Sequence, residues 1–549
     1  MFACFNSISV CIFLGDHSFS FLYAVDSMDA DYTALSPTQF INHFKHMGPL
    51  TTKSGLLRSL VTNAYWESGY GIGLDWCKFH PFTFNLGAQG KSRHNFDLLF
   101  RLDCCRTIIE QFVSINSTVS LPQSDPLPTS SSFPRLFNNA HILHKHINIP
   151  GLILALQFAE YVISMPERPG WSPLYGIDDP LSDVDSTGSV PVSSISSFLL
   201  PFKDILKWNR VVPLYVPPST SPVLNEQQWY IVNRTCVLNP TETAFLSQYI
   251  DSTVTIPQTG VFAQFPRVLL QSARIVLPKL TSLVSPIIPL GNKGLWIIKP
   301  QGGSCGHGIE CLKSLYDLTK YLQDALKEKV FMLQKYIEHP LLIHRYKFDI
   351  RQWVLITSLE PLTIWMYTEP YVRIASIPFT SDDTSRFIHL TNHAVQKSSP
   401  KYGKSSDGPE FLRHGCMMNY PQFNEYLQQL ESGQLNPAKV AFVPDAPPKQ
   451  AMPKFSTLFR EKTLPLFEQI VTTTILSGRD CIEPRLHTYD VVGFDFMIDD
   501  EMNPWLLEVT LSPSFKHDTE IVTPIVEDGI EGIMKGLSQL FYCSLHFLF

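Results

Sequence analysis

The sequence lacks paired cysteines and an excess of either charge. Its 11 cysteines form no Cys-x-x-Cys pair and no regular spacing, and this odd, scattered set is typical of reduced cytosolic thiols rather than of a disulfide framework. Lys and Arg number 43 against 50 Asp and Glu, a net charge of −7. The charge balance therefore gives no reason to expect nucleic acid or a membrane as a partner, and an acidic partner must meet a local basic surface.

Long hydrophobic runs and nucleophile motifs are also missing. Residues 1–25 are apolar and aromatic, but they lack the basic start of a signal peptide, and Asp16 and His17 interrupt the run. We interpret them as a buried first strand or as an extension from an upstream start, with Met28 as an alternative start. No other stretch could cross a membrane, so we expect a soluble protein. No order of Ser, His and Asp and no cysteine setting indicates a protein nucleophile.

The composition is that of a large folded chain. Hydrophobic residues make up 44% and charged residues 17% of the 549 residues, which predicts a globular protein of two or three domains. Proline- and serine-rich stretches and changes of pattern divide the chain into four predicted segments: an N-terminal extension at 1–34, a small N-terminal α/β domain at 35–116, a linker and central region with irregular insertions at 117–260, and a larger α/β (α+β) domain at 261–540.

The stretch Tyr489–Pro513 predicts a β-hairpin. Apolar residues alternate along two strands, Asp490–Ile498 and Trp505–Thr510, on either side of the acidic loop DDEMNP. If Ile498 closes against Trp505, every pair of facing residues is fixed. Gly493 then lies opposite Thr510.

This register places Asp495 directly opposite Glu508. The two carboxylates share a face with Thr510, whereas the other face takes the apolar side chains of Phe494, Phe496, Leu507 and Val509. Like charges opposed at roughly 5 Å destabilise a sheet, and a divalent cation such as Mg²⁺, which prefers carboxylate oxygens, would remove the repulsion. The alternative is a protonated carboxyl group or one exposed at a sheet edge.

A lysine followed by a glycine-rich loop predicts phosphate contacts. Lys299 ends a short apolar strand, and QGGSCGHG follows at 301–308. The glycines join two predicted strands, whereas a Walker loop leads into a helix, so we interpret the loop as a flap whose backbone N–H groups can cover phosphates. An ordinary glycine-rich turn is the alternative.

A charged strand adds further polar groups. Lys347, Asp349 and Arg351 alternate with apolar residues, so that their side chains share one face. This pattern suits a phosphate and ribose site, although a solvated sheet face produces it too. Cations for a triphosphate, a glycine flap and paired carboxylates together predict an ATP-dependent ligase or kinase that acts by positioning and charge neutralisation.

Seven ordered segments resemble the catalytic domain of the tubulin–tyrosine ligase-like family, whose members have an ATP-grasp fold. The segments are WIIKPQGGSCGHGI, LQKYIEHPLLI, KFDIRQWVLIT, LTIWMYTEPYVR, HLTNHAVQK, GFDFMID and WLLEVTLSPS. Several are most similar to the glycylase branch, as are NHF, LTTKSGL and KFHPFTFNLG upstream, at 42–44, 50–56 and 78–87. The resemblance implies ATP-dependent addition of glycine to the γ-carboxyl group of glutamates in tubulin tails, through an acyl phosphate.

The resemblance also implies roles for matching residues, with ATP and Mg²⁺ as cofactors. Arg373, Lys299 and Glu508 would be catalytic, and Arg373 would bind the carboxylate of the amino acid or acceptor. The implied nucleotide contacts are Lys299, Cys305 and Gly306 at the phosphates, Gln334, Lys335, Tyr336 and Ile337 at adenine, and Lys347, Asp349, Thr391 and Asn392 elsewhere. The implied metal ligands are Asp495, Glu508 and Thr510.

Two departures from the family's pattern leave alternatives open. Thr510 stands where the third metal ligand is usually asparagine, and the flap reads SCGHG where many glycylases carry SRGRG. The alternatives are a polyglutamylase of the same family, which should need an extra cation for the incoming side-chain carboxylate, and a catalytically weak protein that docks on microtubules.

The implied partners are tubulin or microtubules, through their acidic C-terminal tails, and glycine. We expect a monomer in the cytoplasm and cytoskeleton, including the axoneme of a cilium or flagellum. Binding of acidic tails requires a basic surface, for which the candidates are His43, Lys45, Lys53, Lys78, Lys91 and Arg93.

Overall fold

The computed structural model divides into two compact units, which are described separately. Unit 1 comprises Met1–Asn85, Ile297–Cys311 and Glu328–Phe549, and unit 2 comprises Leu86–Trp296 and Leu312–Lys327. The predicted central region, 117–260, lies almost entirely outside the described residues, and the predicted domain boundaries stay predictions. The structure describes residues 10–13, 20–23, 40–69, 74–86, 91–115, 155–156, 159, 162–163, 265–291, 294–303, 305–313, 315–324, 330–403, 409–432, 434 and 454–546.

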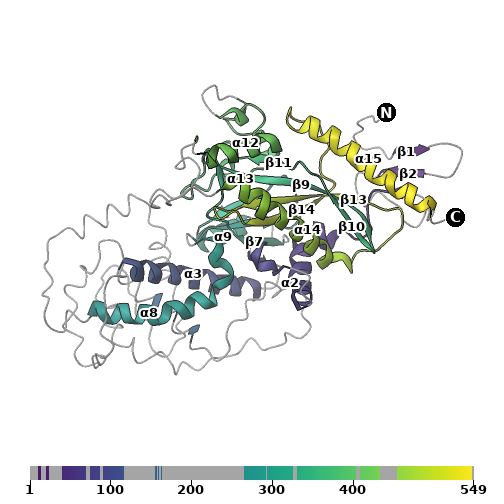
Figure 1. Ribbon diagram of the computed structural model, residues 1–549. Helices are drawn as coiled ribbons and strands as arrows, with labels where there is room; N and C mark the ends of the chain where they lie inside the picture. The colour runs from purple at the N-terminus through teal and green to yellow at the C-terminus, as the bar shows by residue number, and fades with distance from the viewer. Residues whose placement is uncertain are drawn as a thin grey trace. The chain divides into compact units, whose positions relative to one another are not determined.

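Unit 1 is built on a seven-stranded sheet (Figure 1). Its order is β12-β11-β9-β13-β14, and β8 and β10 each pair with β9. Every pairing is antiparallel, and with its helices this gives the predicted α+β class. The strands are β8 Leu342–Ile343, β9 Tyr346–Leu359, β10 Leu362–Met366, β11 Tyr371–Ile374, β12 Met417–Met418, β13 Asp490–Ile498 and β14 Pro504–Leu511.

One face of this sheet is an apolar core. Phe348 in β9 packs against Phe423 of helix α12, Tyr420–Glu431, with ring centroids 5.4 Å apart. Phe496 in β13 stacks on Phe467 of α14, Leu464–Arg479, at 4.1 Å. Because side chains alternate along a strand, the residues between these aromatic groups face the opposite side, where the charged residues of β9 and β13 lie.

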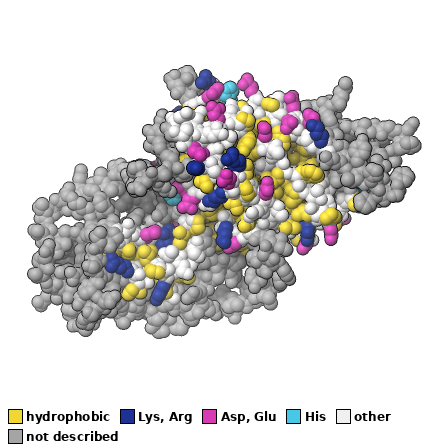
Figure 2. Space-filling model, in the orientation of Figure 1, with side chains coloured by type: hydrophobic (Ala, Val, Ile, Leu, Met, Phe, Trp, Pro, Cys, Tyr) yellow, Lys and Arg dark blue, Asp and Glu magenta, His cyan; other side chains and the backbone are white. Residues whose placement is uncertain are grey.

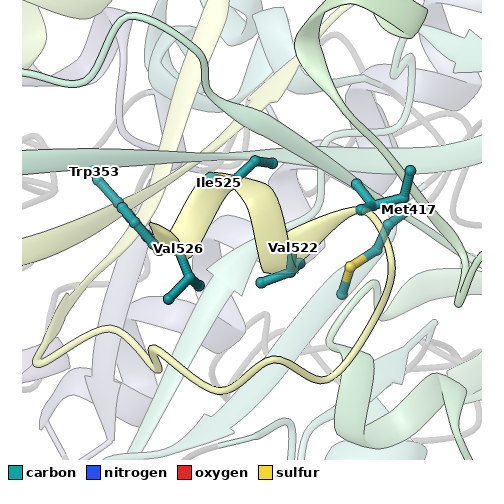
Figure 3. Packing of buried hydrophobic residues seen from close by; sticks show 6 residues of the cluster. Trp353, Met417, Val522, Ile525 and Val526 are labelled. Atoms are coloured by element: carbon teal, nitrogen blue, oxygen red, sulfur yellow. The ribbon is translucent and has the colours of Figure 1, made fainter. Parts of the chain in front are cut away.

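The C-terminal helix α15, Val522–His546, packs against Trp353 of β9 (Figure 3). Trp353 comes two residues after Arg351, so its side chain lies on the same face of the sheet as those charges. Gly529 lets the helix approach closely, since a Cβ atom there would lie 2.5 Å from Cζ3 of Trp353 in β9. Tyr367 also donates a hydrogen bond to Asp528 at 2.7 Å. The buried cluster that holds the helix consists of Trp353, Met417, Ile521, Val522, Ile525 and Val526.

A smaller sheet of four strands carries the predicted phosphate residues. Its order is β4-β7-β5-β6. The glycine-rich loop joins β5 to β6, as predicted, and Lys299 is the penultimate residue of β5. The strands are β4 Thr83–Leu86, β5 Trp296–Pro300, β6 Glu310–Leu312 and β7 Phe331–Lys335.

The N-terminal part of unit 1 forms short strands and two helices. Strands β1, Val10–Phe13, and β2, Ser20–Tyr23, pair with each other, and β2 pairs with β3, Phe40–Ile41. Ile41, the last residue of β3, exchanges backbone hydrogen bonds with the residues that precede β13: its N–H donates to His487 O at 3.1 Å, and Tyr489 N donates to Ile41 O at 3.1 Å. This segment therefore lies beside the start of the predicted hairpin.

The remaining described elements are helix α2 of unit 1, short helices, and the elements of unit 2. In unit 2, the helices α3, Lys91–Ile115, and α8, Phe265–Leu283, pack against each other. Among the helices of the described ranges, none is long and apolar enough to cross a membrane. The other elements are α1 Gly48–Thr51, α2 Lys53–Gly69, η2 Trp76–Lys78, η7 Ser285–Leu290, α9 Leu315–Asp324, α10 Arg386–His389, α11 His393–Gln396, η8 Glu410–Leu412, α13 Phe455–Leu458 and the π-helix η10 Phe459–Thr463.

Candidate active site

Five charged side chains form a row across four neighbouring strands. Arg373 pairs in register with Asp349, Arg351 with Asp495, and Asp495 with Glu508. Arg373 donates to both oxygens of Asp349, at 2.8 and 2.5 Å, and to Asp495 Oδ2 at 2.8 Å. Nε of Arg351 lies 2.6 Å from Asp495 Oδ1. The alternation of charges predicted for β9 therefore produces a continuous network on one face of the sheet.

The predicted opposition of Asp495 and Glu508 is confirmed, although the hairpin closes one residue earlier than predicted. Ile498 pairs with Pro504 instead of Trp505, and the register shifts by one between Asp495 and Phe496. This β-bulge compensates for the wrong closing pair. The predicted register therefore holds from Asp495 toward the start of β13.

The bulge also changes the side of the sheet on which Leu507 lies. We predicted Leu507 on the apolar face with Phe496, but Leu507 lines the same two cavities as Glu508. In a bulge two consecutive residues face one residue of the partner strand, so the alternation of side chains breaks at that point. The prediction was wrong for Leu507.

Gly493 leaves the space that Arg351 occupies. A Cβ atom on Gly493 would lie 2.2 Å from Nη1 and 3.1 Å from Cδ of Arg351. No heavy atom can be accommodated at that distance, so a methyl group at position 493 would displace the Arg351 side chain. Glycine at this position therefore leaves room for Arg351 in the place from which it pairs with Asp495.

We expect Gly493→Ala to destabilise unit 1 by about 1–3 kcal/mol, because the new methyl group overpacks the site. Denaturant unfolding of the full chain measures this, with Gly532→Ala as the control, since a Cβ there meets nothing within 4 Å. In an Arg351→Ala background the same change should cost little. An equal cost in both backgrounds would contradict the account.

The first cavity brings together nearly all of the predicted site residues. These residues come from separate strands and loops of unit 1 and line the same cavity. Of the predicted set only Thr510 lies elsewhere, in the wall of the second cavity. The predicted residues that line the first cavity are Lys299, Cys305, Gly306, Gln334, Lys335, Tyr336, Ile337, Lys347, Asp349, Arg373, Thr391, Asn392, Asp495 and Glu508.

Two buried lysines in this cavity are held by neutral partners. Lys299 donates to Gln334 Oε1 at 2.7 Å, and Lys347 donates to the hydroxyl of Tyr336 and to the carbonyl of His389, both at 2.7 Å. Burial lowers the pKa of each ammonium group to about 8. An anion bound between the two ammonium groups would interact with two cations in a site that excludes water. The neutral partners compensate the charge of these cations only incompletely.

Asp349 and Lys335 are already engaged by protein partners. Asp349 accepts from Thr391 Oγ1 at 2.7 Å in addition to Arg373. The ammonium of Lys335 pairs with Glu338 at 2.5 Å, and both side chains are fully buried. The side chain of Lys335 thus supports the cavity wall through an ion pair that the sequence did not indicate.

The glycine-rich loop has the backbone of a tight flap. Cys305 and Gly306 have φ angles of 60° and 78°, a left-handed conformation that glycine adopts without strain. A Cβ on Gly306 would lie 2.7 Å from Val395 and 3.1 Å from Asn392 Oδ1. Glycine therefore lets the flap lie against the segment that carries Thr391 and Asn392.

Lys53 is a site residue that the sequence analysis assigned to the protein surface. It begins helix α2, lines both cavities, and donates a hydrogen bond to the carbonyl of Gly303 at 3.1 Å. The next residue, Ser54, accepts a hydrogen bond from Gln301 at 2.7 Å. The start of α2 therefore holds the flap from the side, over a separation of about 250 residues that no local sequence pattern reveals.

The second cavity adjoins the first, and most of the charged side chains in its wall are cations. The two share Lys53, Lys299, Arg373 and Glu508 in their walls. The further charged residues that line the second cavity are Arg351, Lys397, Lys516 and Asp518. An acidic ligand is the kind that this wall would attract.

The predicted basic surface is only partly accessible. His43 is 2% exposed and pairs with Asp490, so its assignment to a docking surface was wrong. Lys45 is exposed but pairs with Glu483 at 2.9 Å. On the face drawn in Figure 2, Lys and Arg side chains of the described residues are interspersed with Asp and Glu.

The paired carboxylates fit a hard divalent cation. Asp495 is 1% exposed, and its Oδ1 accepts no well-aligned hydrogen bond even though Arg351 lies close. Burial raises the pKa of Asp495, whereas Lys299 holds the pKa of Glu508 below its ordinary value against the effect of burial. Within the described ranges no group of three or more His, Cys, Asp and Glu could hold a metal. Two carboxylates plus phosphate and water oxygens are a common set for Mg²⁺.

Comparisons with known proteins agree with the resemblance. Tubulin glycylase 3D of Tetrahymena thermophila is 26% identical over 526 residues, which cover 92% of this chain and 44% of that protein. Tubulin monoglycylase TTLL3 of Danio rerio is 25% identical over 535 residues, 95% of this chain and 57% of that protein. The chain thus spans about half the length of these relatives.

A shorter match has a higher sequence identity. Tubulin glycylase 3B of Tetrahymena thermophila is 34% identical over 247 residues, 45% of this chain and 18% of that protein. The model of the tubulin-tyrosine ligase family matches residues 268–541, which contain both strands of the hairpin, the glycine-rich flap and the charged strand β9. Through these residues, about half of its length, the chain belongs to the tubulin-tyrosine ligase family.

Proposed function

We propose that the protein is an ATP-dependent ligase that adds glycine to the γ-carboxyl group of glutamate side chains in tubulin tails. The observation that carries this proposal is the convergence of Lys299, Lys347, the glycine-rich flap and the Asp495–Glu508 pair on one cavity, in a family whose fold is ATP-grasp-like. The names of the relatives, tubulin glycylase and tubulin monoglycylase, supply the amino acid and the acceptor.

The nucleotide would occupy the first cavity. Lys299 and the N–H groups of the flap would contact the phosphates, and the segment from Gln334 to Ile337 would hold the adenine. Lys347, Asp349, Thr391 and Asn392 would contact the rest of the nucleotide. The low pKa of the two buried lysines supports this arrangement, because a triphosphate would restore their full charge.

Asp495 and Glu508 would hold Mg²⁺, which would neutralise charge on the transferred phosphoryl group. Arg373 and Arg351 would then face substrate carboxylates from the second cavity, although in this structure both guanidinium groups lie against Asp495. Thr510 lies on the same side of β14 as Glu508, and its role as a ligand stays a prediction.

The chemistry needs no protein nucleophile. The acceptor γ-carboxylate would attack the γ-phosphorus of ATP, forming an acyl phosphate and releasing ADP. The glycine amine would then attack the acyl carbon, an amide bond would form, and phosphate would leave. Positioning and fixed charge would supply most of the rate enhancement.

Product analysis tests this mechanism. With ATP, glycine and microtubules we expect ADP and phosphate to form in equal amounts with glycine transfer. Microtubules whose C-terminal tails have been removed by limited proteolysis are the matched control, and they should support neither. If AMP and pyrophosphate formed instead, the intermediate would be an acyl adenylate and not an acyl phosphate.

Lys53 provides a prediction that separates the nucleotide site from the docking surface. We expect Lys53→Gln to raise the KM for ATP about tenfold, the loss of one charge-assisted hydrogen bond, with little change in the KM for microtubules. Arg58→Gln, on the exposed side of the same helix, is the control. If only the KM for microtubules rose, Lys53 would belong to the docking surface and not to the nucleotide site.

We propose tubulin or microtubules as the macromolecular partner and glycine as the co-substrate. The relatives' names point to tubulin, and we propose the cytoskeleton, in the cytoplasm or in the axoneme of a cilium or flagellum, as the site of action. A monomer suffices for this proposal, because unit 1 alone supplies every residue assigned above.

A further inference from the structure

Ser512, His43 and Asp490 form a hydrogen-bonded row beside the second cavity. Nδ1 of His43 lies 2.6 Å from Asp490 Oδ1, and Oγ of Ser512 lies 3.3 Å from His43 Nε2. Asp490 begins β13, His43 follows β3, and Ser512 follows the last residue of β14. The sequence analysis found no Ser, His and Asp in a suggestive order, because His43 lies more than 440 residues from both partners.

The hydrogen bonds favour one tautomer of His43. Asp490 is fully buried and also accepts a hydrogen bond from Phe44 N at 2.7 Å. Burial raises the pKa of Asp490, and the hydrogen bonds from His43 and Phe44 N oppose this rise. With Asp490 as the acceptor, Nδ1 of His43 is the donor, and Nε2 accepts from the amide of Asn42 at 3.1 Å and lies 3.3 Å from Ser512 Oγ. In this tautomer an imidazole can accept a proton through a serine hydroxyl.

Ser512 links this buried pair to the second cavity. His43 itself is 2% exposed, whereas Ser512 is half-buried and lines the cavity. Ser512 also has a φ angle of 52°, a conformation that costs a residue other than glycine about 1–3 kcal/mol and is found mostly where function requires it. The strained backbone holds the hydroxyl between the imidazole and the cavity.

The proposed reaction needs a proton acceptor at this cavity. The amine of glycine is protonated at neutral pH, and an ammonium group has no lone pair with which to attack an acyl carbon. The lysines and arginines of the wall cannot accept the proton while they are charged, and a bound triphosphate would keep Lys299 charged although burial lowers its pKa to about 8. His80 and His393 also line the cavity, but burial lowers the pKa of His80 to about 3 and that of His393 below its ordinary value, which weakens both as bases. Nε2 of His393 also lies 2.8 Å from the hydroxyl of Tyr402.

We propose that Ser512, His43 and Asp490 are a proton relay that deprotonates the incoming glycine, an inference that rests on the proposed function. The ammonium gives a proton to Ser512 Oγ as the hydroxyl proton of Ser512 passes to His43 Nε2. The imidazolium is stabilised by Asp490, and the freed amine attacks the acyl phosphate. The N–C bond forms, the C–O bond to phosphate breaks, and phosphate carries away the electron pair together with the second proton of the amine.

Two nucleophiles with different protonation states test the relay. Hydroxylamine is largely unprotonated at neutral pH, so it attacks an acyl phosphate without a base and yields a hydroxamate. We expect Ser512→Gly to lower kcat with glycine about 100-fold and to leave hydroxamate formation unchanged. Glycine accepts the positive φ, so this variant removes the hydroxyl without adding strain, and Ser514→Ala, on the same loop and beside the same cavity, is the control.

The outcomes separate the relay from the proposed function. Equal loss with both nucleophiles in Ser512→Gly would make Ser512 a structural residue and overturn the relay. Full retention of glycine transfer would overturn it too. If the unaltered protein formed a hydroxamate but no glycine product, the ligase would stand and the glycine relay would fall. If it formed neither, the proposed function would fail and the relay with it.

Discussion

Replacement of Glu508 by Gln is expected to lower glycine transfer about 10²–10³-fold. Glu508 lies opposite Asp495 in the central hairpin and lines both cavities, so the change removes one of the two carboxylates proposed to bind Mg²⁺. It also removes a like charge beside Asp495, and opposed like charges destabilise a sheet. The fold should therefore be kept, and the loss should appear in kcat at saturating ATP.

The matched control for this variant is Asp518→Asn. Asp518 lines the second cavity, is exposed, and lies 3.8 Å from Lys397, so it loses the same charge at a rim position where ion pairs contribute little. We expect its activity to stay within about threefold of the unaltered protein. Equal rates for the two variants would show that the Asp495–Glu508 pair has no special part in the reaction.

Replacement of Lys335 by Met is expected to destabilise the protein by about 3–5 kcal/mol, the cost of breaking a buried ion pair from one side. The ammonium lies 2.5 Å from Glu338 Oε1, and both side chains are fully buried. Its loss leaves the fully buried Glu338 carboxylate without the ammonium group that pairs with it. Urea unfolding of the full chain, followed by tryptophan fluorescence, measures the effect.

A double variant separates the charge from the packing. Lys335→Met with Glu338→Leu removes both partners, and such a replacement is often close to neutral. We therefore expect it to recover most of the stability that the single variant loses. If the double variant were no more stable than Lys335→Met, the loss would come from packing around Lys335 and not from the unpaired carboxylate.

The core of the site follows from a period of two residues. Alternation along a strand is a local property, so the facing positions of Asp495 and Glu508 and the shared face of Lys347, Asp349 and Arg351 could be predicted from the chain itself. The bulge could not, because the extra residue at Leu507 is chosen by how β14 closes against its neighbours. The facing positions of Asp495 and Glu508 were thus predicted correctly, although the predicted closing pair of the hairpin was wrong by one residue.

The parts that could not be predicted join residues far apart in the chain. Lys53 contacts Gly303, and His43 contacts Asp490 and Ser512, through packing that depends on the whole of unit 1. From the sequence, Lys53 and His43 were merely basic residues in a charged segment. Both belonged to segments that resembled the glycylase branch. The resemblance therefore pointed to these segments, but the local sequence could not show what Lys53 and His43 contact.

The measurement that tests the central claim most directly is transfer of labelled glycine, against labelled glutamate, from solution to purified microtubules with ATP and Mg²⁺. The account predicts ATP-dependent incorporation of glycine, none of glutamate, and a loss of incorporation when Glu508 is replaced by Gln. Incorporation of glutamate would keep the fold and the nucleotide site but assign the protein to the polyglutamylases. Binding to microtubules with transfer of neither amino acid would contradict the account and leave a docking protein.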